Sequence, residues 1–296
     1  MDASQSGGKQ KTNQLYVVLN PIAGQSDAGL LKNTLEEAFA KEGWTLDVYE
    51  TTGGEDVAEL TRAAIERGAE LVVAAGGDGT VAGVVNGLAN SGVPLGILPV
   101  GTGNGLARAL GIPLGVEDAL ALLVGGHEIV NMDAMQVGDK YYILNVSAGI
   151  SARSMQETPP EQKRRFGMLA YAWTIAKQVM GFQPRSFSLE LDGHQVQVQA
   201  TEVLISNGAV LKEPPFPLGP RQKFNDGVFD VYIITASNLS DYIRILWDLI
   251  FNRTGRKKEL RTLTVNDEKW WRQVEIVTEG VDFPEEHILI LAQQQE

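Results

Sequence analysis

The stretch ELVVAAGGDGT, residues 70–80, joins a run of aliphatic residues to a glycine-rich turn. Two further stretches, LYVVLNPIAG at residues 15–24 and PLGILPVGTGNG at residues 94–105, repeat this arrangement. Short aliphatic runs bounded by turn residues are typical of strands that are buried on both faces, as in a parallel sheet. The sequence therefore predicts parallel strands that are each followed by a loop rich in glycine.

Segments with helical periodicity separate these strands. Apolar residues recur every three or four positions in segment 31–43, and segment 55–68 likewise ends at a glycine. Between them WTLDVYE, residues 44–50, alternates as a strand does. Strands that alternate with helices predict right-handed crossovers and a doubly wound parallel sheet, here up to about residue 130.

From residue 133 onward the pattern becomes that of antiparallel strands. MQVGDKYYILNV at residues 135–146 predicts one hairpin, and SFSLELDGHQVQVQATEVLIS at residues 186–206 predicts another. The second half of the chain should therefore be mostly β. Further elements expected there are a strand at residues 227–235 and helices near residues 164–180 and 239–251.

Composition excludes several classes of protein. The 296 residues include 25 lysine and arginine and 37 aspartate and glutamate, and the net charge of −12 argues against a dedicated nucleic-acid-binding protein. Without cysteine there is no disulfide scaffold and no thiolate metal site. Residues 1–14 are polar and predict a flexible tail, and no apolar stretch reaches the roughly 20 residues that span a bilayer. We therefore expect a cytoplasmic protein that is at most peripheral to a membrane.

The three glycine-rich loops should share one edge of the sheet, because parallel strands present their carboxyl ends together. Backbone N–H groups in such loops, with hydroxyl donors such as those of Thr80 and Thr102, suit phosphate oxygens. A tight turn is the alternative interpretation of NPIAG. A carboxylate in a phosphate site is favourable beside a metal ion or a ribose hydroxyl, which makes Asp78 a candidate ligand. The alternative for Asp78 is a helix N-cap.

The segments LNPIAG, GGDGTVAGVVNGL and LPVGTGNGLARALGIP, in this order, resemble the diacylglycerol kinase catalytic domain, and among its members the bacterial lipid kinases related to sphingosine kinases. GGDGT alone is shared with NAD kinases, whereas PVGTGNGLAR is more specific. The resemblance implies an α/β nucleotide-binding domain at residues 15–132, a β-sandwich lipid-substrate domain at 133–284, and a return of residues 285–296 to the first domain. It also implies transfer of the ATP γ-phosphate to a lipid hydroxyl with magnesium.

The resemblance further implies which residues contact ATP. They lie in the loops after the strands, with Thr51 placed by its spacing to Asp56. An ordinary residue at a strand end is the alternative for Thr51. The ATP-contacting residues implied are Asn20, Gly24, Thr51, Gly76, Gly77, Asp78, Gly79, Thr80, Gly101, Thr102 and Asn104.

A magnesium site is implied by KFNDGVFDV. The resemblance assigns the metal to Asp226 and to the backbone carbonyls of Lys223 and Val228, with Asp133 near the metal network. An Asn-Asp-Gly turn is also what a hairpin uses, and that alternative stays open.

The catalytic base of the family is the glutamate of an aspartate-glycine-glutamate turn near the C-terminus. This chain has Thr278-Glu279-Gly280 instead, so Glu279 is the candidate base, with an ordinary turn residue as the alternative. Gly83 also departs from the family, which usually has an acidic residue there. A NAD kinase-like enzyme and a non-catalytic nucleotide- or lipid-binding protein are the rival functions.

Two segments combine basic and aromatic residues, at positions 162–185 and 243–261. Such segments suit the surface of an anionic membrane, where the lipid substrate would be met. The alternative is that their apolar sides pack onto the β domain. The expected partners are ATP and a lipid substrate at a membrane surface, with no nucleic acid; the oligomeric state is not predicted.

Overall fold

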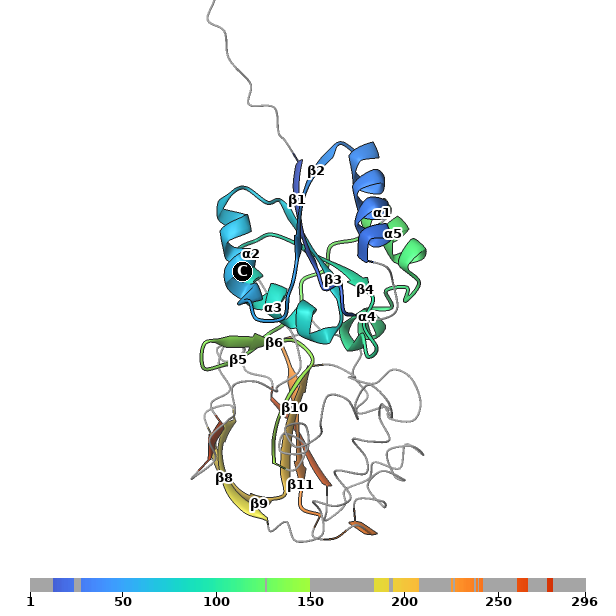
Figure 1. Cartoon of the computed structure of the whole chain (residues 1–296). Helices are drawn as coiled ribbons and strands as arrows, with labels where there is room; N and C mark the ends of the chain where they lie inside the picture. The colour runs from blue at the N-terminus through green and yellow to red at the C-terminus, as the bar shows by residue number, and fades with distance from the viewer. Residues whose placement is uncertain are drawn as a thin grey trace, which may run out of the picture. The chain divides into compact units, whose positions relative to one another are not determined.

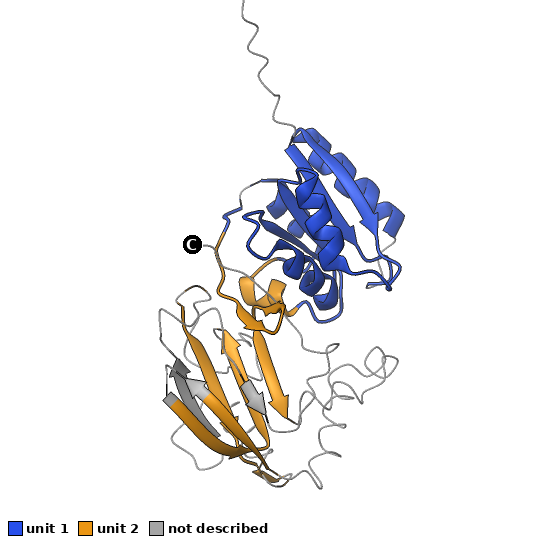
Figure 2. Cartoon of the chain, turned by 90° about the vertical axis from the view of Figure 1, so that its left-hand side faces the viewer, with its two compact units in different colours: residues 1–104, 113–129 blue, residues 105–112, 130–296 orange. Residues whose placement is uncertain are grey.

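The computed structural model describes residues 13–23, 28–125, 127–149, 184–191, 194–207, 225, 227–236, 238, 240–241, 260–265 and 276–278. The chain divides into two compact units (Figure 2). The first comprises Met1–Asn104 and Pro113–Ile129, and the second comprises Gly105–Ile112 and Val130–Glu296.

The first unit is built on a parallel four-stranded sheet of order β2-β1-β3-β4 (Figure 1). The strands are β1 (Asn13–Leu19), β2 (Trp44–Glu50), β3 (Leu71–Gly76) and β4 (Leu95–Pro99). Five of the seven residues of β1 and five of the six of β3 are buried, as expected of central strands covered on both faces. The predicted parallel sheet is therefore confirmed.

Helices cover both faces of this sheet, with α2 and α3 on one side and α1 and α5 on the other (Figure 1). Helix α1 (Ala28–Lys41) buries Leu31, Leu35 and Phe39, which recur every four residues and form one stripe. The other helices are α2 (Val57–Glu66), α3 (Asp78–Leu88) and α5 (Val116–Val124). The doubly wound arrangement follows from the alternation of strands and helices along the chain.

Glycines allow α2 and α3 to approach closely. A Cβ atom at Gly83 would lie 2.6 Å from Cβ of Val57, and one at Gly87 would lie 2.6 Å from the carbonyl oxygen of Ala58. A larger side chain at position 83 therefore has no room here, because α2 fills that space.

The second unit contains two antiparallel sheets, of order β12-β11-β10-β7 and β13-β8-β9, and a hairpin of β5 and β6. It also contains the short helix α4 (Gly105–Leu110). Its strands are β5 (Met135–Val137), β6 (Lys140–Tyr142), β7 (Asn145–Gly149), β8 (Arg185–Leu191), β9 (His194–Ala200), β10 (Glu202–Asn207), β11 (Phe229–Ile234), β12 (Leu260–Val265) and β13 (Ile276–Thr278).

Both sheets contribute to one core. Phe187 and Leu189 from β8 pack in the same buried cluster as Ile205 from β10 and Val231 from β11. Alternate residues of β7, β8, β10 and β11 contribute to this cluster, as in a β-sandwich. The predicted antiparallel second half and its hairpins are confirmed.

Several expectations fall outside the described residues. They concern the tail up to residue 12, the helix near residues 164–180, and the return of residues 285–296. Of the helix near residues 239–251 only Ser240 and Asp241 are described, and nearly all of the two basic and aromatic segments is likewise outside. Within the described part of the chain, no helix combines the length and the apolar character needed to cross a membrane.

Replacing Gly87 with alanine should destabilise the first unit, because the added Cβ meets backbone of α2 that cannot move aside as a side-chain tip can. We expect the free energy of unfolding, measured by urea denaturation, to fall by about 1 to 3 kcal/mol, the usual cost of overpacking. The control is Gly79→Ala on the same helix, whose Cβ position has nothing within 4 Å among the described residues. An equal loss in both variants would contradict the packing argument.

Candidate functional site

The loops after β1, β3 and β4 meet at the carboxyl-terminal edge of the parallel sheet. The side-chain amide of Asn20 donates to the hydroxyl oxygen of Thr80 over 3.4 Å, and the backbone N–H of Asn20 donates to the Ala75 carbonyl over 2.9 Å. The N–H of Val100 donates to the Gly76 carbonyl over 3.2 Å. These bonds fix the first and third loops to the second.

The second and third loops touch through glycine backbone. A Cβ atom at Gly77 would lie 3.3 Å from the Cα of Gly101, and one at Gly101 would lie closer still to Gly77. Gly77 itself has φ −91°, a value open to any residue, so the glycine serves close approach and not an unusual backbone angle. The two loops therefore approach one another backbone to backbone, and backbone N–H groups in such loops suit the binding of an anion.

Asp78 extends from the second loop to the third. Helix α3 begins at Asp78 with Gly77 as its N-cap, so the alternative interpretation of Asp78 as the N-cap is wrong. A Cβ atom at Gly103 would lie 3.6 Å from the carboxyl carbon of Asp78. The half-buried carboxylate thus stands between two glycine-rich loops, where a cation would be needed to accompany phosphate.

Asn104 closes the third loop. It has φ +53°, and its side-chain amide donates to the carbonyls of Gly101 over 2.7 Å and Pro99 over 3.3 Å. Its Oδ1 atom is buried and has no hydrogen-bond partner among the residues that the structure describes. Because a buried acceptor without a donor is costly, this atom is suited to a donor from a ligand or a bound water.

Thr51 joins this edge from the neighbouring strand. It is 7% exposed, and its N–H donates to the Leu19 carbonyl over 2.8 Å, at the point where β1 ends and Asn20 begins. Thr51 directly follows β2, so it is a residue at a strand end and also lies beside the first loop. The two interpretations of Thr51 do not exclude one another.

The other predicted nucleotide residues are placed as follows. Thr80 is buried and Thr102 is exposed, so their two hydroxyls differ in access to solvent. Gly24 lies outside the described residues. The first loop is therefore described only as far as Ala23.

Asp133 binds the backbone of the predicted metal turn. The carboxylate is fully buried, and its Oδ2 accepts a hydrogen bond of 2.6 Å from the N–H of Gly227. The side-chain amide of Asn207 donates to the Asp133 carbonyl over 2.9 Å. The carboxylate therefore holds the turn that precedes β11, a role that the sequence did not predict.

The metal assignment itself stays a prediction. Lys223 and Asp226 lie outside the described residues, whereas Val228 is buried beside the turn. Among the residues with described positions, no three histidine, aspartate or glutamate side chains gather as a metal site.

The position of the candidate base can be stated only through its neighbours. Strand β13 ends at Thr278, which pairs with Phe187 of β8 in the second unit. Glu279 follows it and lies outside the described residues. Its role as base stays a prediction.

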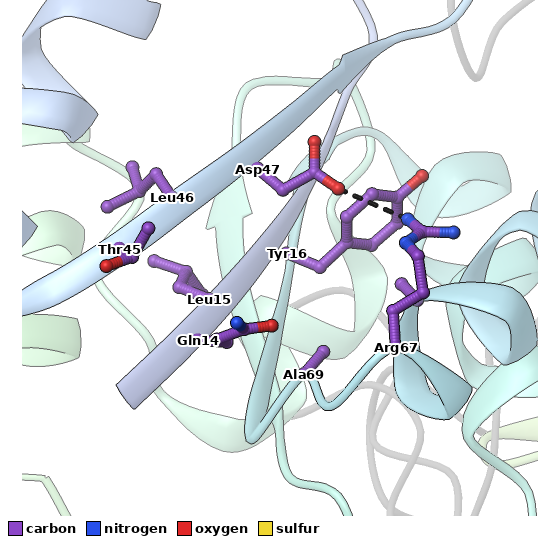
Figure 3. Close-up of a pocket in the computed structure, with 9 residues that line it drawn as sticks. Gln14, Leu15, Tyr16, Thr45, Leu46, Asp47, Arg67 and Ala69 are labelled. Atoms are coloured by element: carbon purple, nitrogen blue, oxygen red, sulfur yellow. Dashed lines mark hydrogen bonds and ion pairs between the residues drawn. The ribbon is translucent and has the colours of Figure 1, made fainter. Parts of the chain in front are cut away.

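A pocket of about 130 Å³ lies at the opposite end of the parallel sheet (Figure 3). Asp47 and Arg67 form an ion pair of 3.2 Å there, and the Arg67 guanidinium stands 5.9 Å from the ring centre of Tyr16. Burial, with Asp47 as a weaker cause, raises the pKa of Tyr16. The two charged side chains that line this pocket therefore pair with one another.

Comparisons with known proteins agree with this architecture. Residues 14–137 match the diacylglycerol kinase catalytic domain, and residues 144–278 match the YegS C-terminal NAD kinase beta sandwich-like domain. An α/β unit with three glycine-rich loops, followed by a β-sandwich, is the arrangement of these two matched domains. The chain belongs to the diacylglycerol kinase family.

The relatives cover most of the chain. It is 32% identical over 241 residues to the diacylglycerol kinase of Bacillus subtilis (strain 168), and the aligned residues cover 77% of this chain and 76% of that protein. It is 30% identical over 236 residues to the diacylglycerol kinase of Staphylococcus aureus (strain Newman), covering 78% and 73%. A crystal structure of a diacylglycerol kinase from Bacillus anthracis str. Sterne shares the fold, with a TM-score of 0.66 and 21% identity over 87% of this chain and 85% of that one.

Replacing Asp133 with alanine should destabilise the second unit, because the Gly227 N–H loses its side-chain acceptor. We expect the free energy of unfolding in urea to fall by about 1 to 3 kcal/mol. Asp139→Ala, in the exposed turn between β5 and β6, is the control. If the two variants are equally stable, the Asp133 carboxylate does not hold the turn.

Proposed function

We propose that this protein is an ATP-dependent lipid kinase that transfers the γ-phosphate to the hydroxyl of a diacylglycerol-like lipid, with magnesium as cofactor. Membership of the diacylglycerol kinase family supports a kinase. The observation that carries the proposal is the meeting of three glycine-rich loops at one sheet edge, with the Asp78 carboxylate between two of them.

Phosphoryl transfer depends on positioning the phosphates and on offsetting their charge. In this proposal the N–H groups around Gly77 and Gly101 bind phosphate oxygens, since no Cβ blocks the approach. The hydroxyls of Thr80 and Thr102 add donors. Asn20, bonded to Thr80, holds the first loop in place.

The residues of this edge fit a nucleotide with a divalent cation. Carboxylate oxygen is the ligand type that magnesium prefers, and Asp78 supplies it beside the phosphate loops. Magnesium, when bound, neutralises charge on the phosphates. Asp226 and the carbonyls of Lys223 and Val228 would hold a second magnesium in the other unit, with Asp133 fixing the adjacent turn.

The acceptor hydroxyl must lose its proton to a base within hydrogen-bond reach. We assign this role to Glu279, the residue after β13. We assign the lipid acceptor to the β-sandwich unit and its approach to the basic and aromatic segments at residues 162–185 and 243–261, which suit an anionic membrane surface.

The experiment that tests the function measures transfer of labelled γ-phosphate from ATP to a panel of acceptors. The panel contains diacylglycerol, monoacylglycerol, a sphingoid base and NAD. The proposal expects labelled diacylglycerol or a related lipid. Labelled NAD alone would favour the NAD kinase-like alternative, and ATP binding without any labelled product would favour a non-catalytic protein.

Replacing Asp78 with asparagine should abolish most phosphoryl transfer, because it removes the carboxylate that accompanies the phosphates. We expect turnover to fall on the order of 10²- to 10³-fold, the effect of losing several kcal/mol of charge stabilisation. The matched control is Asp118→Asn, since Asp118 also lies in the first turn of a helix, α5, and is exposed. Normal turnover in a folded Asp78→Asn variant would contradict the assignment.

A further inference from the structure

The loop between β2 and α2 is organised around the carboxylate of Glu55. Its Oε1 accepts hydrogen bonds of 2.7 Å from both the N–H and the hydroxyl of Thr52. Its Oε2 accepts from the N–H groups of Gly53 at 2.9 Å and Gly54 at 3.2 Å. The hydroxyl of Tyr49 adds a fifth contact, at 3.4 Å from Oε1.

Three successive N–H groups that converge on one point form a nest for an anion. In this loop the anion is a side chain of the protein itself. The hydrogen bonds from Thr52, its hydroxyl first, lower the pKa of the Glu55 carboxyl to about 2. The carboxylate is therefore ionised throughout the pH range in which a kinase works.

The two ends of the loop are fixed by other bonds. Thr51 donates its N–H to Leu19 at the end of β1, and Asp56 caps α2 by accepting from the N–H of Glu59 over 3.0 Å. Residues 52–54 lie between these anchors, and Gly53 has φ +98°, which a side chain would disfavour. The Glu55 carboxylate holds residues 52–54 together by accepting hydrogen bonds from their N–H groups.

The filled nest has a consequence for ligand binding. Because Glu55 uses the N–H groups of residues 52–54, those groups are not offered to a phosphate. The loop instead presents Thr51, held at the end of β1 beside Asn20. The bond to Leu19 holds the N–H side of Thr51 without Glu55, whereas a loop released from Glu55 would no longer fix the N–H of Thr52, and with it the peptide that follows Thr51.

We propose that Glu55 is a positioning residue for the nucleotide, which acts by fixing the peptide that follows Thr51 and so the orientation of Thr51 beside the phosphate loops. This inference rests on the proposed use of ATP. Glu55 itself does not touch the reacting atoms, so its loss should affect nucleotide binding and not the chemical step.

The test compares Glu55→Gln with Glu59→Gln, a control that removes an exposed carboxylate from the first turn of α2. Initial rates are measured against ATP and against the lipid substrate in detergent micelles. For Glu55→Gln we expect KM for ATP to rise about tenfold, the equivalent of one hydrogen bond to a charged group, with kcat and KM for lipid unchanged. Glu59→Gln should match the wild type.

A second variant tests the same contact in case Glu55→Gln fails to fold. Thr52→Val removes the hydroxyl that donates to Glu55 and should raise KM for ATP in the same way but less. Thermal melting checks that both variants fold. Unchanged KM for ATP in both variants, or a loss of kcat in its place, would overturn the inference while leaving the proposed function standing. A wild-type protein that uses no ATP would overturn both.

Acid should abolish the stabilisation that Glu55 provides. A pKa of about 2, below the ordinary 4.5, means that this stabilisation is complete above pH 4.5 and is lost as the pH falls toward 2. Urea denaturation of the wild type and of Glu55→Gln should give the larger difference in free energy of unfolding near neutral pH and a smaller one near pH 3. A difference that does not shrink on acidification would show that the ionised carboxylate does not hold the loop.

Discussion

Backbone crowding at the carboxyl ends of β3 and β4 is the constraint on which the candidate site depends. The loops that follow these strands meet through Gly77 and Gly101, at a separation that a Cβ atom at Gly101 would not permit. This approach also sets the Asp78 carboxylate against Gly103. The first loop then joins through the bond from Asn20 to Thr80. The geometry that the proposed phosphate site needs follows from the packing of glycine, before any charged side chain is considered.

Carboxylates at this edge differ in what surrounds them. Asp78 stands between two glycine-rich loops, in a position suited to a cation that accompanies phosphate. Glu55 is enclosed by donors from its own loop and so needs no cation. Backbone N–H groups thus balance the charge of the Glu55 carboxylate, and in the proposed function a cation would balance that of Asp78.

The sequence predicted the parallel sheet, the glycine-rich loops and the antiparallel second half because local patterns of apolar residues and glycine specify each of them. The bond between Asp133 and Gly227 joins residues 94 positions apart, and no local pattern reports it. From the sequence, Gly83 is only a departure from the family. The structure explains it as a close packing contact with Val57 of the neighbouring helix, which no local pattern reveals. Glu55 was missed because a glutamate in a polar loop is usually solvated, and only the geometry reveals its donors.

The most direct test of a phosphate-binding edge is hydrogen–deuterium exchange of the wild-type protein with and without ATP and magnesium. Slower exchange in ATP is expected at the backbone N–H groups after β1, β3 and β4, around Asn20, Gly77 and Gly101. Unchanged exchange in these loops, with slowing instead around Asp47 and Arg67 at the opposite end of the sheet, would contradict the proposal that these loops bind the phosphates of ATP.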